Sequence, residues 1–102
     1  MIVNGIEVRD TIHEQPTLHD KEFKAWASGK DYPFFDKLSD VIENPKVELQ
    51  KGQKCAVING YKLLLHGFTI MGFTKPDEYG HCVYLNWDCY WFPVKPEEIV
   101  LE

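Results

Sequence analysis

The first helical pattern of apolar residues lies about twenty positions into the chain. Phe23, Trp26 and Ala27 stand at i, i+3 and i+4, and Gly29 follows them. Before them, Thr17 and Asp20 stand three positions apart, which is a variant of the capping box at helix starts. Because this spacing places the apolar side chains on one helical face and glycine commonly ends helices, we expect a helix over residues 18–28.

A longer helical pattern follows Pro33, a residue that suits the first position of a helix. The apolar residues that repeat at i, i+1, i+4, i+7 and i+8 are Phe34, Phe35, Leu38, Val41 and Ile42. Asn44-Pro45 should end the helix, because a residue before proline is pushed out of the helical region. The pattern therefore predicts a second amphipathic helix between Pro33 and Asn44.

After Pro45 the period of the apolar residues shortens to two, which is typical of strands. Asn59-Gly60 separates two apolar runs and predicts a hairpin with a type I′ turn. That turn would place Ile58 opposite Tyr61, Ala56 opposite Leu63 and Cys55 opposite Leu64. Further strands are expected at Phe68–Phe73 after a bend at Gly67, at His81–Trp87, and at Ile99–Leu101 after a tight turn at Pro96-Glu97-Glu98. At the N-terminus, Asn4-Gly5 indicates a short strand or small hairpin over Ile2–Val8.

These elements predict one α+β domain over residues 1–102, with a mainly helical part at 1–46 and an antiparallel β part at 47–102. We expect two N-terminal helices packed against a small antiparallel SH3-like barrel or bent β-sheet. The motif Leu-x-Lys-Gly-Gln-Lys-x-x-Val from Leu49, the glycine-punctuated middle and the exit through a proline turn resemble small SH3-like barrels over residues 47–102. The resemblance implies a fold and no particular chemistry, since such barrels serve many functions.

Composition and charge narrow the class of protein. The 102 residues are 44% hydrophobic and 26% charged, as in ordinary globular proteins. The net charge of −5 opposes phosphate binding, so nucleic acid is not the expected partner. The longest uncharged run, Leu63–Thr74, is shorter than the roughly twenty residues of a membrane span, and no signal peptide precedes it. Three cysteines without close spacing predict free thiols in a reducing compartment, which favours the cytoplasm.

An aromatic segment is the first candidate binding surface. Tyr84, Trp87, Tyr90, Trp91 and Phe92 are five aromatic residues within nine positions. If the strand continues through them, both of its faces carry rings, and a chain of this size would struggle to bury both sets. One set could then form a platform for a partner protein, or for the bases of a single-stranded nucleic acid. The alternative is that the second set packs beneath the N-terminal helices.

The charge distribution gives a second candidate surface. Residues 1–48 and 77–102 are acidic, whereas residues 49–76 hold four lysines and no acid. On the second predicted helix, Asp36, Asp40 and Glu43 stand at i, i+4 and i+7, which would form an acidic stripe opposite the apolar face. Such a stripe is either a solvated face or a surface that docks to a basic partner.

Catalytic and metal sites have weaker support. No Cys or His pair has the spacing of a structural zinc site, and no glycine-rich phosphate loop is present, so no metal or cofactor is expected. The alternative is an enzyme or metal-binding protein that uses Cys82, Cys89, His66 and His81, for example with Cys89 as nucleophile and a histidine as its base, although no glycine-rich nucleophile turn follows Cys89. The sequence therefore favours a small non-enzymatic interaction module that binds a protein, such as an inhibitor or regulator of a nucleic-acid-handling enzyme.

Overall fold

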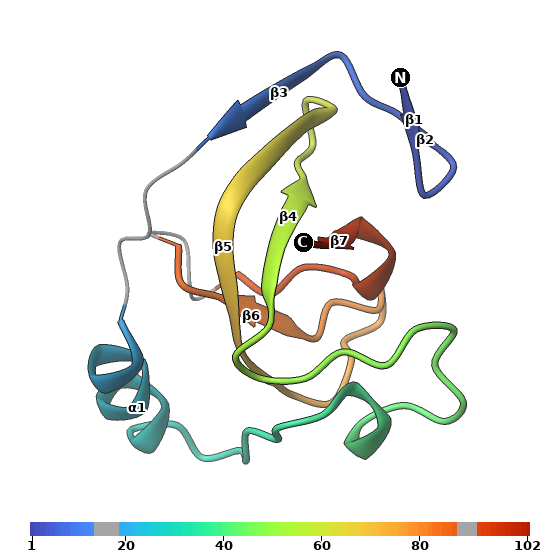
Figure 1. Cartoon of the computed structure of the whole chain (residues 1–102). Helices are drawn as coiled ribbons and strands as arrows, with labels where there is room; N and C mark the ends of the chain where they lie inside the picture. The colour runs from blue at the N-terminus through green and yellow to red at the C-terminus, as the bar shows by residue number, and fades with distance from the viewer. Residues whose placement is uncertain (14–18, 88–91) are drawn as a thin grey trace.

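The computed structural model describes residues 1–13, 19–87 and 92–102 of the chain. Its framework is a curled sheet that forms an open half-barrel around one long strand, as Figure 1 shows. The elements in chain order are β1 (Ile2–Val3), β2 (Ile6–Glu7), β3 (Asp10–His13), α1 (Asp20–Ser28), the 3₁₀ turn η1 (Leu38–Asp40), β4 (Lys54–Ile58), β5 (Leu63–Phe73), β6 (Val83–Leu85), η2 (Pro96–Glu98) and β7 (Ile99–Leu101).

Strand β5 organises the sheet because its two halves pair with different partners. Its first half lies between β3 and β4, and β7 extends the sheet on the far side of β4. Its second half pairs with β6, with Gly72 opposite Tyr84. Gly67 between the halves has a φ of +100°, a region that glycine enters without a Cβ penalty. The register against β4 shifts across this region, and the bulge bends β5 so that the sheet curls.

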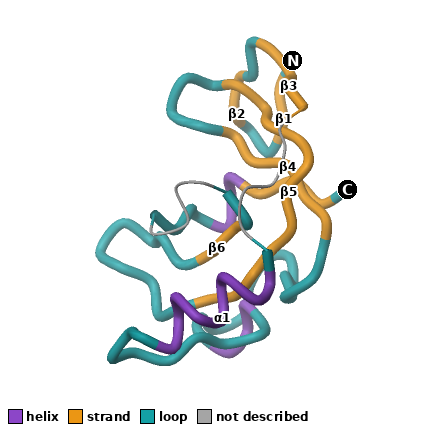
Figure 2. Tube along the Cα trace, turned by 90° about the vertical axis from the view of Figure 1, so that its left-hand side faces the viewer, coloured by secondary structure: helices purple, strands orange, loops and turns teal. Residues whose placement is uncertain are grey.

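The curled sheet is buried on both faces along β4. Cys55 and Val57 belong to the main core cluster, whereas Ala56 and Ile58 belong to a second cluster beneath the N-terminal hairpin. This explains why β4 is an unbroken apolar run after Lys54. A third cluster, around Phe23, lies where α1 meets β5 and β6. Figure 2 shows the hairpin β1–β2 at one end of the molecule and α1 at the other.

Several sequence predictions are confirmed. Asn4 and Gly5 have φ values of 53° and 79°, and they connect β1 to β2 in an antiparallel hairpin. The first predicted helix is α1, whose residues begin at Asp20; Thr17 and Leu18, at its predicted start, lie outside the described residues. The turn at Pro96–Glu98 and the closing strand at Ile99–Leu101 are also present.

The prediction of two N-terminal helices on a barrel is wrong, because residues 33–44 form no α-helix. This segment runs extended and then makes only the short turn η1. Phe35 exchanges both backbone hydrogen bonds with Phe73, at 2.7 and 2.9 Å, and the Leu38 N–H donates to the Leu49 carbonyl. Because the backbone is extended here, the neighbouring side chains of Phe34 and Phe35 pack in different apolar clusters. On the predicted helix, both would have packed on the same apolar face. Tertiary pairing has therefore overridden the helical period.

The expectation of a purely antiparallel sheet is also wrong. Residues 10–13, for which no strand was expected, form β3, which pairs in parallel with β5. The hairpin register differs as well, because Ile58 pairs with Leu64 and not with Tyr61. The Asn59 side chain accepts the N–H groups of Tyr61 and Leu63, and Lys62 adopts a φ of 63°, so the turn is longer than a two-residue type I′ turn.

No helix among the described residues has the length and apolar character to cross a membrane.

Candidate functional site

Two hollows lie next to each other along α1, and Lys51 and Met71 line both of them. The larger one, of about 350 Å³, is here called the aromatic groove. Its lining residues come from α1, the extended 30–36 segment, the turn before β4 and β5: Phe23, Lys24, Ala27, Ser28, Lys30, Tyr32, Pro33, Phe34, Phe35, Asp36, Lys51 and Met71. The smaller one, of about 270 Å³, is called the polar pocket.

Phe34 is the centre of a cluster of five rings. It makes edge contacts with Phe23, Trp26 and Tyr84 at centroid distances of 5.4, 5.6 and 5.1 Å, and Tyr32 lies 5.5 Å away. Phe23 and Tyr84 are buried, whereas Tyr32 keeps 43% of its surface exposed. The cluster therefore has a buried base and an accessible outer edge.

Local sequence explains how these rings meet. Phe23 and Trp26 lie on the same face of α1, which is the spacing that predicted the helix. The helix ends at Gly29, whose N–H bonds to the Trp26 carbonyl, and the chain then returns to pair Phe35 with Phe73 at the end of β5. This path of the chain places Phe34 in contact with the rings of Phe23 and Trp26 on α1.

The rim of the aromatic groove is rich in lysine. Lys30 stacks over the Trp26 ring, with its Nζ 4.7 Å from the centroid. Lys24 and Lys51 both form ion pairs with Asp20, at 3.0 and 3.2 Å. Hydrogen bonds from these two ammonium groups hold the pKa of the Asp20 carboxyl below its usual value. Three lysines and Asp36 line the groove, and Asp20 offsets part of the lysine charge, so a small excess of positive charge remains along this rim.

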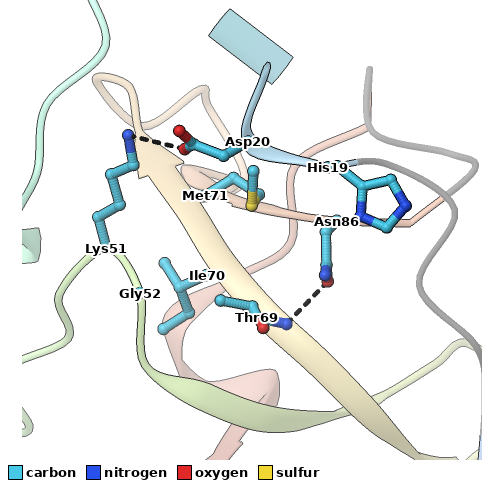
Figure 3. Close-up of a pocket in the computed structure, with 8 residues that line it drawn as sticks. All are labelled: His19, Asp20, Lys51, Gly52, Thr69, Ile70, Met71 and Asn86. Carbon is cyan, nitrogen blue, oxygen red and sulfur yellow. Dashed lines mark hydrogen bonds and ion pairs between the residues drawn. The ribbon is translucent and has the colours of Figure 1, made fainter. Parts of the chain in front are cut away.

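The Asp20–Lys51 ion pair is part of the lining of the polar pocket (Figure 3). Its lining residues are His19, Asp20, Lys51, Gly52, Thr69, Ile70, Met71 and Asn86. Asn86 follows β6 and is 8% exposed, and its Oδ1 accepts the Thr69 N–H at 2.7 Å. The hydroxyl oxygen of Thr69 accepts a hydrogen bond from Lys54 Nζ at 3.1 Å.

The predicted aromatic segment is divided by the structure. Tyr84 is 5% exposed and supports Phe34 from below, while Val83 and Leu85 enter the main core. Trp87 is half-buried and packs on Phe68, with centroids 5.2 Å apart. Phe92 is 69% exposed. The remaining members of the predicted set, Tyr90 and Trp91, lie outside the described residues.

The predicted acidic stripe does not exist as a helical face, because the helix that would carry it is absent. Asp36, Asp40 and Glu43 are all exposed, but they lie on an extended segment, in η1 and in the bend after it. Of the three, Asp36 lines the aromatic groove.

Among the described residues, His19 lines one of the hollows, whereas the other histidines and the thiols of Cys55 and Cys82 line neither. Burial raises the pKa of Cys55 to about 12 and that of Cys82 to about 11, which suppresses thiolate formation at neutral pH. Cys89, considered above as an alternative nucleophile, lies outside the described residues. His66 bonds to Glu102 at 3.1 Å and His81 to Asp77 at 2.9 Å. Within residues 1–13, 19–87 and 92–102, no three His, Cys, Asp or Glu side chains are grouped as a metal ion would require.

Sequence reasoning missed the outer residues of the aromatic groove. Phe34 was assigned to a helix that does not form, and Lys30 and Tyr32 were assigned to the connection before it. One signal was present: Trp26, Tyr32 and Phe34 are three aromatic residues within nine positions, with Lys30 among them.

Neither a family model nor a curated protein nor a solved structure matches this chain.

Proposed function

We propose that this chain is a small non-enzymatic binding module that engages a partner protein through the aromatic groove. The observation that carries the proposal is the ring cluster around Phe34, which is buried at its base and open at its edge. Aromatic residues in such half-open pockets supply much of the binding energy at protein interfaces. The groove has room, at about 350 Å³, for one large apolar side chain of the partner.

The charge around the groove supports an acidic partner segment. The whole chain has a net charge of −5, yet Lys24, Lys30 and Lys51 line this groove. Such a local excess of lysine favours a segment whose apolar anchor is flanked by Asp or Glu, because opposite potentials steer partners together. The occupant that we propose is therefore an extended acidic segment of another protein, with an aromatic or large aliphatic residue at its centre.

Two finer parts of the proposal concern role and compartment. An inhibitor or regulator, for example of a nucleic-acid-handling enzyme, would need only a binding surface and no catalytic group. A cytoplasmic location is supported by Cys55 and Cys82, which are free thiols.

Selection from a random peptide library displayed on phage tests the proposal. We expect the wild-type chain to enrich peptides with one large apolar residue beside acidic residues. Ser28→Trp should abolish this enrichment, because Ser28 lines the groove and an indole would fill it. Ala25→Trp is the matched control, since Ala25 is an exposed residue of α1 outside the groove lining.

Two results would count against the proposal. The first is equal enrichment by both variants, which would place the binding surface elsewhere. The second is failure of the wild-type chain to enrich any consensus while its folding is verified by circular dichroism. A Lys30→Glu variant, compared with Lys21→Glu on the outer side of α1, tests the charge preference separately and should lose acidic peptides selectively.

A further inference from the structure

The chain contains two Asn-Gly pairs, Asn4-Gly5 and Asn59-Gly60, and each of them follows a β-branched residue. Asparagine is a thermolabile residue, above all before glycine, whose backbone nitrogen has no neighbouring side chain to shield it. That nitrogen attacks the Cγ atom of asparagine, ammonia leaves and a five-membered succinimide forms. Water then opens the ring to aspartate or isoaspartate, so the net reaction consumes one water and releases one ammonia. Because the two local sequences are alike, a difference between their rates in the folded protein reports on the fold.

The turn at Asn59 is held in a way that opposes this reaction. The Asn59 Oδ1 accepts the N–H groups of Tyr61 and Leu63 at 2.9 and 3.0 Å. The side chain must release both hydrogen bonds before its Cγ can meet the nitrogen of Gly60. The backbone N–H and carbonyl of Asn59 are also bonded, to Leu63 and Lys62. Since this turn joins β4 to β5, its opening disturbs pairing in the main sheet.

The turn at Asn4 opens more easily, because it belongs to a small peripheral hairpin. Strands β1 and β2 have two residues each, and the hairpin lies at one end of the molecule (Figure 2). A two-stranded hairpin has little stability of its own, and local opening is most frequent in such elements. Both Asn4 and Gly5 are exposed, so water reaches the reacting atoms.

The Asn4 side chain also connects this hairpin to the C-terminal part of the chain. Its amide nitrogen donates to the Ile99 carbonyl at 2.9 Å and to the Glu97 carbonyl at 3.4 Å. An aspartate at position 4 has no donor at neutral pH and carries a negative charge, so it loses both bonds and repels both carbonyl oxygens. At Asn59 the oxygen makes the contacts, and a carboxylate there would accept the same two N–H groups.

From this difference we propose that Asn4 is a site of spontaneous deamidation and that its conversion releases the hairpin β1–β2 from the segment before and within β7. Val3 and Ile6 of the hairpin pack against the second core cluster, so release uncovers apolar surface on this face of the sheet. The modification is therefore a slow, one-way change in the outer part of the fold that needs no enzyme. It does not depend on the aromatic groove.

Peptide mapping by mass spectrometry tests the site on the wild-type chain during incubation at pH 8. In the folded protein we expect Asn4 to be converted about 10-fold faster than Asn59, because its turn opens more easily. In guanidinium chloride the two rates should become similar, since the local sequences are alike. Equal rates in the folded protein, or faster conversion of Asn59, would overturn the proposal. So would a difference that persists in guanidinium chloride, because the fold would then not cause it.

Amide hydrogen exchange of two aspartate variants tests the consequence. Asn4→Asp should speed exchange over β1 and β2 by about 5-fold, while α1 keeps its rate. Asn59→Asp makes the same chemical change at the other pair and should leave exchange unchanged, because its hydrogen bonds are kept. Asn4→Gly removes the side chain without adding charge and tolerates the φ of 53°, so its effect should be smaller than that of Asn4→Asp. Unchanged exchange in Asn4→Asp, an equal increase in Asn59→Asp, or a uniform increase that includes α1 would refute the release of the hairpin.

Discussion

Replacing Tyr84 with alanine tests whether this ring supports the aromatic groove or lies on an exposed platform. The ring is 5% exposed and contacts Phe23, Trp26 and Phe34 at centroid distances of 6.3, 5.8 and 5.1 Å. Burial raises the pKa of its hydroxyl to about 12, and Thr74 hydrogen-bonds to it. Tyr84→Ala would therefore leave a cavity beneath Phe34 and remove three ring contacts at once.

The expected loss of stability is large. Truncation of a buried aromatic residue to alanine costs about 3–5 kcal/mol, which is a large part of the stability of a domain of this size. Tyr84→Phe removes only the hydroxyl and leaves the buried Thr74 without that partner, so its cost should be about 1–2 kcal/mol. A ring on an exposed platform would cost less than about 0.5 kcal/mol in either variant.

Urea unfolding followed by tryptophan fluorescence and by far-UV circular dichroism measures these differences. Coincidence of the two curves justifies a two-state free energy. A loss below about 1 kcal/mol for Tyr84→Ala would refute the packing described for this ring. So would equal losses for the alanine and phenylalanine variants, because the ring contacts would then contribute nothing.

Three further predictions follow from other parts of the fold. Gly67→Ala should lower stability by about 1 kcal/mol or more, because its φ of +100° is strained for alanine; an unchanged urea midpoint would contradict the bend in β5. Asp77 accepts hydrogen bonds from the backbone N–H of His81, from the His81 side chain and from the N–H of Tyr79, and its pKa is lowered from 3.8 to about 2. Because the pKa of Asp77 is lower in the folded state than in the unfolded chain, the ionised carboxylate stabilises the fold above about pH 4, and this stabilisation is lost as the pH falls from about 4 to about 2. Asp77→Asn should therefore flatten this part of an acid titration monitored by circular dichroism. In a Cys89→Ser background, Cys55 and Cys82 should react with Ellman's reagent at pH 8 only after addition of denaturant, and rapid reaction of the folded protein would contradict their burial.

The sequence was a good guide where local chemistry determines structure. The pair Asn4-Gly5 forms the predicted N-terminal hairpin because both residues tolerate positive φ. The i, i+3, i+4 spacing of Phe23, Trp26 and Ala27 identified α1 and the face that it buries. In both cases the determining interactions are within a few residues of each other.

The sequence was misleading where distant backbone pairs. The apolar residues after Pro33 fit a helical period, but Phe35 pairs with Phe73, thirty-eight positions away, and the segment becomes extended. The parallel pairing of β3 with β5 has no local signal, because residues 10–13 are all exposed and carry no alternation of apolar and polar burial. The aromatic groove depends on that same extended segment, so its position could not be predicted once a helix was assigned there.

The most direct test of the proposed binding surface is to add a selected peptide to the wild-type chain and measure which assigned amide resonances shift. The proposed function predicts that the largest shifts cluster at Ala27, Ser28, Phe34 and Met71, along the aromatic groove. Shifts centred on Asp40 and Glu43, or on the exposed edge of β3, would contradict it and would place the partner on a different surface.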